Sequence, residues 1–307
     1  MDMLNVLDID PHAVLINQYD LAVFSCGYEA RSKTYSESIN RRNINKILTL
    51  YFSDSRDVGY RRQNEIHFNE ISDDIVEMKY DDDLPVYEYL NKYVFDNGTR
   101  SLKIMVDYSS MSRLWYISIL NWARYAELDE VLIDFVYSVG DYSGAITPLV
   151  IDEILAIPGH EGVTTHSKTL SIFGLGYDSL TTLCVLDKLE PSVVHSFIAG
   201  SFFENYIDKT ESYNKEFIDN YSEPVLYFPF TSVEKTYRMM SELISPYRDE
   251  YNISFIPMGP KPHVLAAALV SLKYSEIINL YVKGKRHSPP IVKPNGDYVC
   301  TRVSFSK

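Results

Sequence analysis

The stretch Phe173-Gly174-Leu175-Gly176-Tyr177-Asp178 closes an apolar run, and it repeats an earlier stretch, Phe24-Ser25-Cys26-Gly27-Tyr28-Glu29. The earlier copy also closes an apolar run, Leu21–Ser25. A glycine, a tyrosine and an acid that directly follow a strand suit a tight exit from a sheet, because glycine has no side chain to clash there. The recurrence predicts two copies of one structural unit.

A second pair of stretches supports this duplication. Lys103–Arg113 passes from an apolar strand through a polar loop into an apolar helix, and Ile253–His263 does the same at nearly the same spacing. Further strands end near Tyr137 and Tyr281, so the order of the segments agrees as well. The alternative is that two unrelated α/β domains share a glycine after their first strand.

Strand-like runs alternate with helix-like stretches along both halves. Continuous apolar runs such as Ile47–Phe52 and Val193–Ile198 are typical of strands covered on both faces, and stretches with helical spacing such as Ser112–Ala126 separate them. The alternation predicts an α/β fold of two tandem Rossmann-like domains with largely parallel sheets, related by an internal duplication. Glycines and prolines punctuate the middle of the chain, so we place the domains at residues 1–150 and 151–307.

The composition excludes several classes of partner. The 307 residues include 29 Lys and Arg against 42 Asp and Glu, a formal net charge of −13, whereas coating duplex DNA or an anionic membrane needs a basic face. No apolar run approaches the roughly 20 residues that span a bilayer, and residues 1–11 contain no basic side chain of a signal peptide. The three cysteines lack a C-x-x-C pair. We expect a cytoplasmic protein that binds neither membranes nor bulk duplex DNA.

The most informative loop is Pro257–His263 in the second half. Ligands of open parallel sheets bind outside the carboxyl ends of the strands, where this loop is predicted to lie. Gly259 permits a close backbone approach, and Lys261 and His263 can donate hydrogen bonds to a phosphate. The alternative is a rigid turn from strand to helix with a solvated lysine.

The matching loop of the first half offers Ser109, Ser110 and Arg113. The serines can cap the following helix in any protein, so their hydroxyls alone indicate little. The guanidinium of Arg113 can bind a phosphate with two parallel hydrogen bonds. An equally good interpretation is that Arg113 pairs with Asp107 across the turn.

The paired strand-end loops complete two candidate pockets. Tyr28 and Tyr177 can stack on a base, and Glu29 and Asp178 can accept hydrogen bonds from ribose hydroxyls or a base N–H, beside Gly176. Packing and helix capping are equally good explanations for these residues.

A dense cationic cluster follows the last strong strand of the second half. Lys283, Lys285 and Arg286 can close over a polyanion near the same end of the sheet. The alternative is an ordinary hairpin into a final strand, Tyr298–Phe305.

The known cofactor and catalytic motifs are missing. Neither G-x-G-x-x-G nor G-x-x-x-x-G-K-[ST] occurs, so we expect no nicotinamide cofactor and no nucleoside triphosphatase loop. No group of histidines, cysteines or acids has the spacing of a metal site. Cys26 is interpreted as a buried structural thiol, because no histidine lies at a diagnostic position beside it.

The second half resembles the CRISPR-associated Rossmann-fold (CARF) domains. The resemblance rests on the opening Gly174–Ser179 and on Pro257–His263, which looks like their ligand loop; the first half has Ser109–Arg113 in its place. Two fused copies are similar to the related SAVED domains of bacterial antiphage systems, which sense cyclic oligonucleotides. The resemblance implies a nucleotide or cyclic oligonucleotide as ligand.

We therefore expect a protein that binds a nucleotide or a nucleic-acid end, as a sensor or accessory subunit of an antiphage system with a protein partner encoded nearby. One alternative is an enzyme of the phosphodiesterase or N-glycosidase type, in which Lys261 and His263 stabilise developing charge. The other alternative is a structural scaffold subunit of a defence complex.

Overall fold

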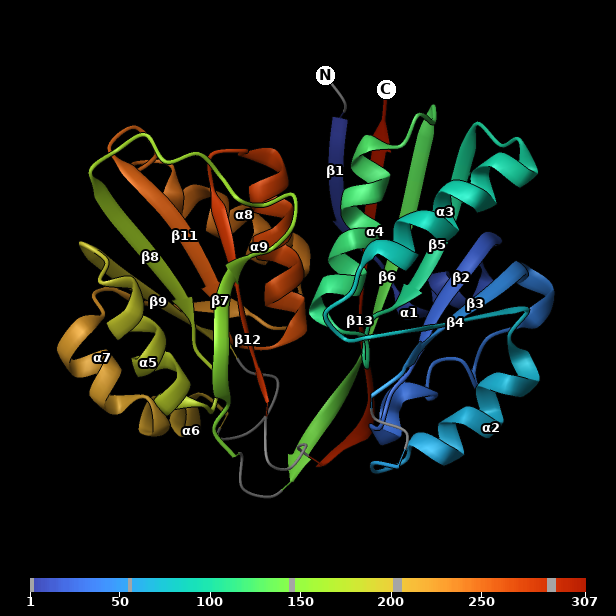
Figure 1. Ribbon diagram of the computed structural model, residues 1–307, viewed down its shortest axis with the longest axis horizontal. Coiled ribbons are helices and arrows are strands. Elements are labelled where there is room, and N and C mark those ends of the chain that lie inside the picture. Colours follow the sequence, from blue (N-terminus) through green and yellow to red (C-terminus); the bar gives the residue numbers. More distant parts are fainter. Residues whose placement is uncertain (1–2, 55–56, 144–146, 201–205, 286–290) are drawn as a thin grey trace. The chain divides into compact units, whose positions relative to one another are not determined.

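The computed structural model describes residues 3–54, 57–143, 147–200, 206–285 and 291–307. The chain divides into two compact units (Figure 1). The first unit comprises Met1–Ser143 and Ile291–Lys307, and the second comprises Gly144–Pro290. Each unit is an α/β domain built on its own sheet.

The first unit carries a seven-stranded sheet. Its strands are β1 (Met3–Asp8), β2 (Tyr19–Cys26), β3 (Ile44–Phe52), β4 (Asp74–Met78), β5 (Ser101–Asp107), β6 (Glu130–Ser143) and β13 (Ile291–Ser306). Its helices are α1 (Pro11–Ile16), α2 (Arg61–Ile71), α3 (Leu84–Asn97) and α4 (Arg113–Tyr125), with short 3-10 turns at Ala30–Ser32 and Arg41–Asn43. The helix α3 ends at Gly98, whose φ of 57° is the left-handed conformation that glycine adopts without strain.

The strand order of the first sheet is β1-β13-β6-β5-β2-β3-β4. The five strands from β6 to β4 run parallel, and β13 is antiparallel to both β6 and β1. Taken in chain order, the parallel strands have the arrangement 3-2-1-4-5, which is that of Rossmann-type sheets. The sheet is therefore a doubly wound one extended by an antiparallel edge.

The second unit repeats this arrangement with six strands. Its strands are β7 (Val150–Ala156), β8 (Lys168–Gly174), β9 (Val193–Gly200), β10 (Val225–Pro229), β11 (Tyr251–Pro257) and β12 (Ile278–Lys285). Its helices are α5 (Ser179–Leu189), α6 (Tyr206–Tyr213), α7 (Lys215–Tyr221), α8 (Val233–Ile244) and α9 (Lys261–Lys273).

The order of the second sheet is β10-β9-β8-β11-β12-β7, with β8 to β12 parallel and β7 antiparallel to β12. The parallel strands again follow the arrangement 3-2-1-4-5. The helices α5 to α7, which connect β8, β9 and β10, lie on one face of the sheet. The helices α8 and α9, which lead to β11 and β12, lie on the other face (Figure 1). The Rossmann-like α/β fold that the sequence predicts is confirmed in both halves.

The boundary of the second domain differs from the predicted one. We expected residues 151–307 in one domain, but β13 pairs with β6 and β1 in the first sheet. Its Arg302 donates two hydrogen bonds, of 2.7 and 2.8 Å, to the fully buried carboxylate of Asp134 on β6. The second unit is therefore inserted between two neighbouring strands of the first, and the expected final strand, Tyr298–Phe305, belongs to the first unit.

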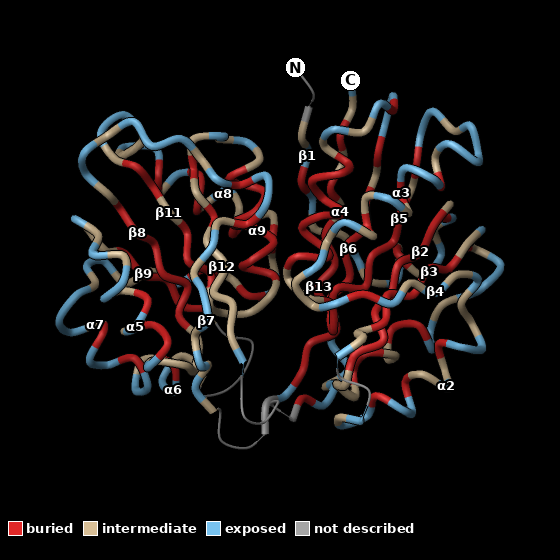
Figure 2. The backbone as a smooth tube through the Cα atoms, viewed as in Figure 1, coloured by how far each residue is buried: buried red, intermediate tan, exposed pale blue. Residues whose placement is uncertain are grey.

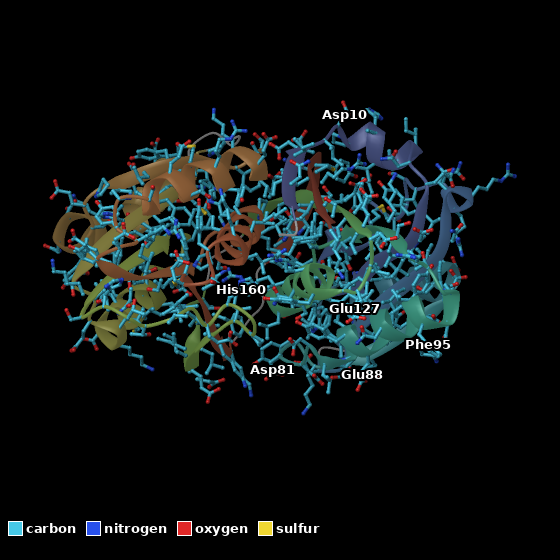
Figure 3. All side chains as sticks on the ribbon, turned by 90° about the horizontal axis from the view of Figure 1, so that it is seen from above. Asp10, Asp81, Glu88, Phe95, Glu127 and His160 are labelled. Atoms are coloured by element: carbon cyan, nitrogen blue, oxygen red, sulfur yellow. The ribbon has the colours of Figure 1, made fainter. Side chains whose placement is uncertain are left out.

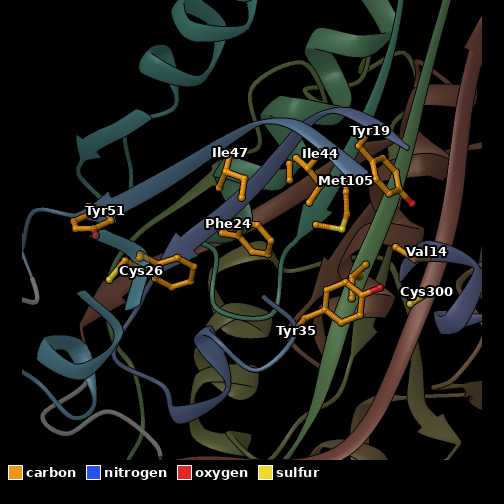
Figure 4. Packing of buried hydrophobic residues seen from close by; sticks show 13 residues of the cluster. Val14, Tyr19, Phe24, Cys26, Tyr35, Ile44, Ile47, Tyr51, Met105 and Cys300 are labelled. Carbon is orange, nitrogen blue, oxygen red and sulfur yellow. The ribbon is translucent and has the colours of Figure 1, made fainter. Parts of the chain in front are cut away.

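Apolar side chains from the strands make the cores. Figure 2 shows the central strands of each sheet as buried. In the first unit Phe24, Ile47 and Met105 belong to one cluster, which also includes Cys26 (Figure 4). Charged side chains such as Glu88 and Glu127 are exposed at the outside of this unit (Figure 3). Burial of such apolar surface is the main favourable contribution to folding.

Candidate functional site

Each sheet has a switch point, which we define as the place where the connections of two adjacent parallel strands leave in opposite directions. In the second unit it lies between β8 and β11, and in the first between β2 and β5. Ligands of open α/β sheets bind outside the carboxyl ends of the strands at such points. The four loops that the sequence singled out follow these four strands.

The two loops of the second unit meet backbone to backbone. A Cβ atom on Gly176 would lie 3.1 Å from the carbonyl oxygen of Met258, and one on Gly259 would lie 3.1 Å from that of Leu175. A side chain at either position would press on the backbone of the other loop, so glycine favours the close approach of the two loops. This contact places Tyr177 and Lys261, each close to one of the glycines, on either side of the junction.

A buried asparagine holds the first of these loops. The amide nitrogen of Asn214, between α6 and α7, donates to the carbonyl oxygen of Gly176 at 2.7 Å and to that of Thr210 at 2.8 Å. Asn214 is 1% exposed, and its amide oxygen has no hydrogen-bond partner within the described part of the chain. The amide therefore ties the strand-end loop to the last turn of α6.

Asp178 acts as a helix cap. Its carboxylate accepts from the backbone N–H of Thr181 at 3.1 Å, in the first turn of α5, and from that of Leu149 at 3.0 Å. An acid at a helix N-terminus also interacts favourably with the helix dipole. The capping interpretation thus accounts for two of its hydrogen bonds.

Three of the predicted cations lie on elements next to this loop. Lys261 is the first residue of α9 and is partly buried. On β12, Lys285 pairs in register with Val150, which follows Leu149, so the end of β12 reaches the segment bonded to Asp178. Lys283 lies 3.7 Å from the carboxylate of Glu153. The third member of the predicted cluster, Arg286, lies outside the described residues.

His263 is sequestered from the loop surface. It is 1% exposed, its Nε2 lies 3.1 Å from the carbonyl oxygen of Pro229, and its ring lies 5.5 Å from that of Phe197. Burial lowers its pKa to about 4, so the imidazole is neutral at pH 7. The structure thus gives His263 a packing role in place of the phosphate contact that the sequence suggested.

Aromatic rings surround the tied loop. The ring of Tyr177 lies 5.2 Å from that of Tyr206 and 5.7 Å from that of Tyr213, both on α6. Burial raises the pKa of Tyr177. The sequence pointed to Tyr177 but not to the two tyrosines of α6.

The switch point of the first unit is held in the same way at one position. Asn64 of α2 is fully buried and donates from its amide nitrogen to the carbonyl oxygens of Gly27 at 2.8 Å and Glu29 at 2.9 Å. A Cβ on Gly27 would lie 3.0 Å from that of Ser110, so the two loops are again in contact. Asn64 corresponds to Asn214, a further repeat that the sequence carries at nearly the same spacing and that we had not predicted.

The remaining polar side chains of this first switch point bond to one another in a chain, which we call the first-unit network. Ser109 donates to the carboxylate of Asp107, and its Oγ accepts from the backbone N–H of Ser138 at 2.7 Å. Arg31 donates from Nη1 to the carbonyl oxygen of Ser138 at 3.0 Å and from Nε to Glu29 at 2.7 Å.

Burial makes this network costly to disrupt. Arg31 is 1% exposed and the side chain of Glu29 is 12% exposed, and the Oγ of Ser110 also lies 3.4 Å from the Glu29 carboxylate. The guanidinium of Arg31 stands 4.9 Å from the centre of the Tyr137 ring. Neither Arg31 nor Ser138 was predicted, because a loop arginine and a strand serine have no local signal for burial.

Two further predicted residues border this network. The carbonyl oxygen of Tyr28 accepts from the backbone N–H of Tyr60 at 2.9 Å, which attaches the first loop to the start of α2. Arg113 begins α4 and is partly buried. Asp107, the other half of the pairing that we considered for Arg113, accepts from the N–H and the hydroxyl of Ser109.

Cys26 does not resemble a nucleophile. It is fully buried beside Tyr51 (Figure 4), and its Sγ lies 2.7 Å from Nη1 of Arg61. Burial raises its pKa to about 12, so the thiolate is negligible near neutral pH. The prediction of a buried structural thiol agrees with this environment.

The described residues include neither a candidate metal site nor a helix that could span a membrane. Among the residues that the structure describes, no group of three or more histidines, cysteines or acids lies together in an arrangement that could hold a metal ion. None of the described helices is long and apolar enough to cross a membrane.

Comparisons with known proteins add little to this picture. No family model and no curated protein matches the chain. Among solved structures, the crystal structure of an N-terminal ketoreductase from a macrolactin assembly line is similar over 90% of this chain and 72% of that chain, at 10% identity and a TM-score of 0.25. The fold assignment therefore rests on the strand order.

Proposed function

We propose that the protein binds a phosphate-bearing nucleotide at the switch point of the second unit. The observation that carries the proposal is the junction of the loops after β8 and β11, where Gly176 and Gly259 allow backbone contact. This contact brings the ring of Tyr177 and the cation of Lys261 to one end of the sheet. An aromatic ring can stack on the base of a nucleotide, and an ammonium group can bind its phosphate.

The charge distribution supports a phosphate site at the same end of the sheet. Lys285 and Lys283, the latter also close to the carboxylate of Glu153, lie at the end of β12, in a chain whose net charge is −13. A local cluster of cations in an acidic protein attracts a small anion without favouring bulk nucleic acid. The first N–H groups of α9, beside Lys261, add a favourable dipole for a phosphate.

The resemblance stated above suggests the setting of this activity. It makes the proposed role that of a sensor or accessory subunit of an antiphage system, with a protein partner and a nucleotide or cyclic oligonucleotide as its signal. The enzymatic alternative assigned charge stabilisation to Lys261 and His263, and the burial of His263 gives no support to the part of that histidine.

Isothermal titration with nucleoside monophosphates and cyclic dinucleotides tests the proposal. We expect heat of binding from at least one nucleotide and a roughly tenfold or larger loss of affinity in Lys261→Ala, because a charged hydrogen bond contributes about 1.5–3 kcal/mol. The matched control is Lys188→Ala, an exposed lysine in the last turn of α5 at the other end of the sheet. Absence of heat with every nucleotide, in a folded protein, would contradict the proposal.

A further inference from the structure

An amide bridge brings two tyrosines of the second unit together. Asn214 donates to the carbonyl oxygen of Gly176. Tyr177 follows the glycine on one side of the bridge, and Tyr213 precedes the asparagine on the other. Their rings are consequently held 5.7 Å apart, at a tilt of 59°.

A third tyrosine extends the group along α6. Tyr206 and Tyr213 are seven residues apart, which is two helical turns, so they share one face of the helix. Between them on that face lies Thr210, which is fully buried and donates to the carbonyl oxygen of Tyr206 at 2.9 Å. Tyr206 itself packs against the core of the unit and lies 5.2 Å from Tyr177.

Exposure differs along this group of rings. Tyr206 and Tyr177 are partly buried, whereas Tyr213 is 58% exposed. Two rings are thus fixed by packing, and the third presents aromatic surface to solvent. Such an arrangement costs little conformational entropy when a flat ligand is added, because its anchoring rings are already ordered.

We infer that Tyr177, Tyr206 and Tyr213 form a stacking platform for the base of the bound nucleotide, and that the platform favours purines. This inference rests on the proposed function, because the platform would bind the base of the same nucleotide whose phosphate Lys261 is proposed to bind. Aromatic side chains stack on every base, and the larger purine ring overlaps more of the platform than a pyrimidine does. The junction of Gly176 with Gly259 sets the two parts of the site next to each other.

The test compares three probes by isothermal titration: adenosine 5′-monophosphate, uridine 5′-monophosphate and ribose 5-phosphate. We expect the adenine nucleotide to bind most tightly and Tyr213→Ala to weaken it by about tenfold. Tyr213→Phe should retain most of the affinity, because it keeps the ring. The control is Tyr221→Ala, on α7, which removes a tyrosine of similar exposure (52%) whose ring contacts Phe217.

The outcomes separate the platform from the phosphate site. If ribose 5-phosphate binds as tightly as the adenine nucleotide, or if Tyr213→Ala leaves adenine binding unchanged, the platform is overturned while the proposed phosphate site stands. If none of the three probes binds, the purine platform is overturned, and the proposed phosphate site is overturned as well only when the cyclic dinucleotides of the full panel also give no heat. Retention of affinity for ribose 5-phosphate in Tyr213→Ala, together with loss for the adenine nucleotide, supports the platform specifically.

Discussion

The two switch points share a topology and one asparagine clamp, but they use their polar side chains differently. In the first unit, Arg31, Glu29 and Ser109 bond to one another and to Ser138 in a buried network. In the second unit, backbone contacts between glycines replace that network, and tyrosines and lysines lie around the junction. The same fold thus supplies a cross-linked junction in one unit and a candidate ligand site in the other.

This difference shows that the topology of a switch point sets where a ligand could bind, whereas the side chains present decide whether the place can serve as a binding site. Polar groups that satisfy one another stabilise a junction, because leaving any of them unpaired in the interior is costly. Side chains at the surface of a junction are accessible to a ligand. The comparison makes distinct predictions for stability in the first unit and for binding in the second.

The largest expected effect is the loss of Arg31. In Arg31→Ala the largely buried carboxylate of Glu29 and the carbonyl oxygen of Ser138 lose their guanidinium donor, and we expect the free energy of unfolding of the first unit to fall by about 3–5 kcal/mol. Tryptophan fluorescence in urea measures this unit alone, because both tryptophans of the chain lie in α4. Arg62→Ala, which removes a 79% exposed arginine, is the control. A cost below about 1 kcal/mol for Arg31→Ala would show that the network does not stabilise the junction.

Acid should weaken the second unit before the first. Burial lowers the pKa of His263 and of His160 to about 4, so both are neutral when folded and become protonated more readily when unfolded. Their contribution is complete above about pH 6.5, is lost as the pH falls from there towards 4, and amounts to on the order of 3 kcal/mol for His263.

Circular dichroism in the near ultraviolet reports the tyrosines of both units during this titration, whereas tryptophan fluorescence reports the first unit alone, so a transition seen only by circular dichroism belongs to the second unit. We expect His263→Gln to flatten the pH dependence of the second unit between pH 6.5 and 4. An unchanged pH profile in that variant would exclude His263 as the source. Simultaneous acid unfolding of both units would contradict the predicted order.

The asparagine clamps should differ by the number of loop carbonyls that they hold. Asn64 bonds to two, those of Gly27 and Glu29, whereas Asn214 bonds to one loop carbonyl, that of Gly176. We expect Asn64→Ala to destabilise the first unit by about 2 kcal/mol and Asn214→Ala to cost the second unit about 1 kcal/mol. Only Asn214→Ala should also weaken nucleotide binding. Equal losses of nucleotide affinity in the two variants would remove the distinction between the units.

Much of the fold could be predicted from local sequence. Apolar runs followed by glycine, as at Phe173 and Gly174, indicate buried strands and their exits, and the repeated order of such segments indicated two similar sheets. The return of β13 to the first unit had no such signal, because it depends on pairing with β6 across more than half of the chain. The buried ion pair of Arg302 with Asp134 reinforces that pairing but is equally non-local.

The candidate site was only partly predictable for the same reason. Local patterns located Gly176, Gly259 and Lys261 at strand ends, and the structure brings these loops together. The partners that hold the loops, Asn64 and Asn214, lie on distant helices, although their spacing repeats that of the glycines. The predicted phosphate contact of His263 was inferred from its closeness to Lys261 in the sequence. The apolar residues that follow it in α9 were a better indication that its side chain is buried.

The central claim is that the second unit holds the principal nucleotide site, and the affinities of Lys261→Ala and Arg113→Ala test it most directly. Arg113 begins the helix that follows β5, and Lys261 begins the helix that follows β11. The two residues therefore occupy equivalent positions in the two units, and the pair is a matched comparison. Isothermal titration, with thermal unfolding as the folding control, should show about a tenfold or greater loss for Lys261→Ala and little change for Arg113→Ala. Loss of binding in Arg113→Ala, with Lys261→Ala unaffected and both variants folded, would contradict the account.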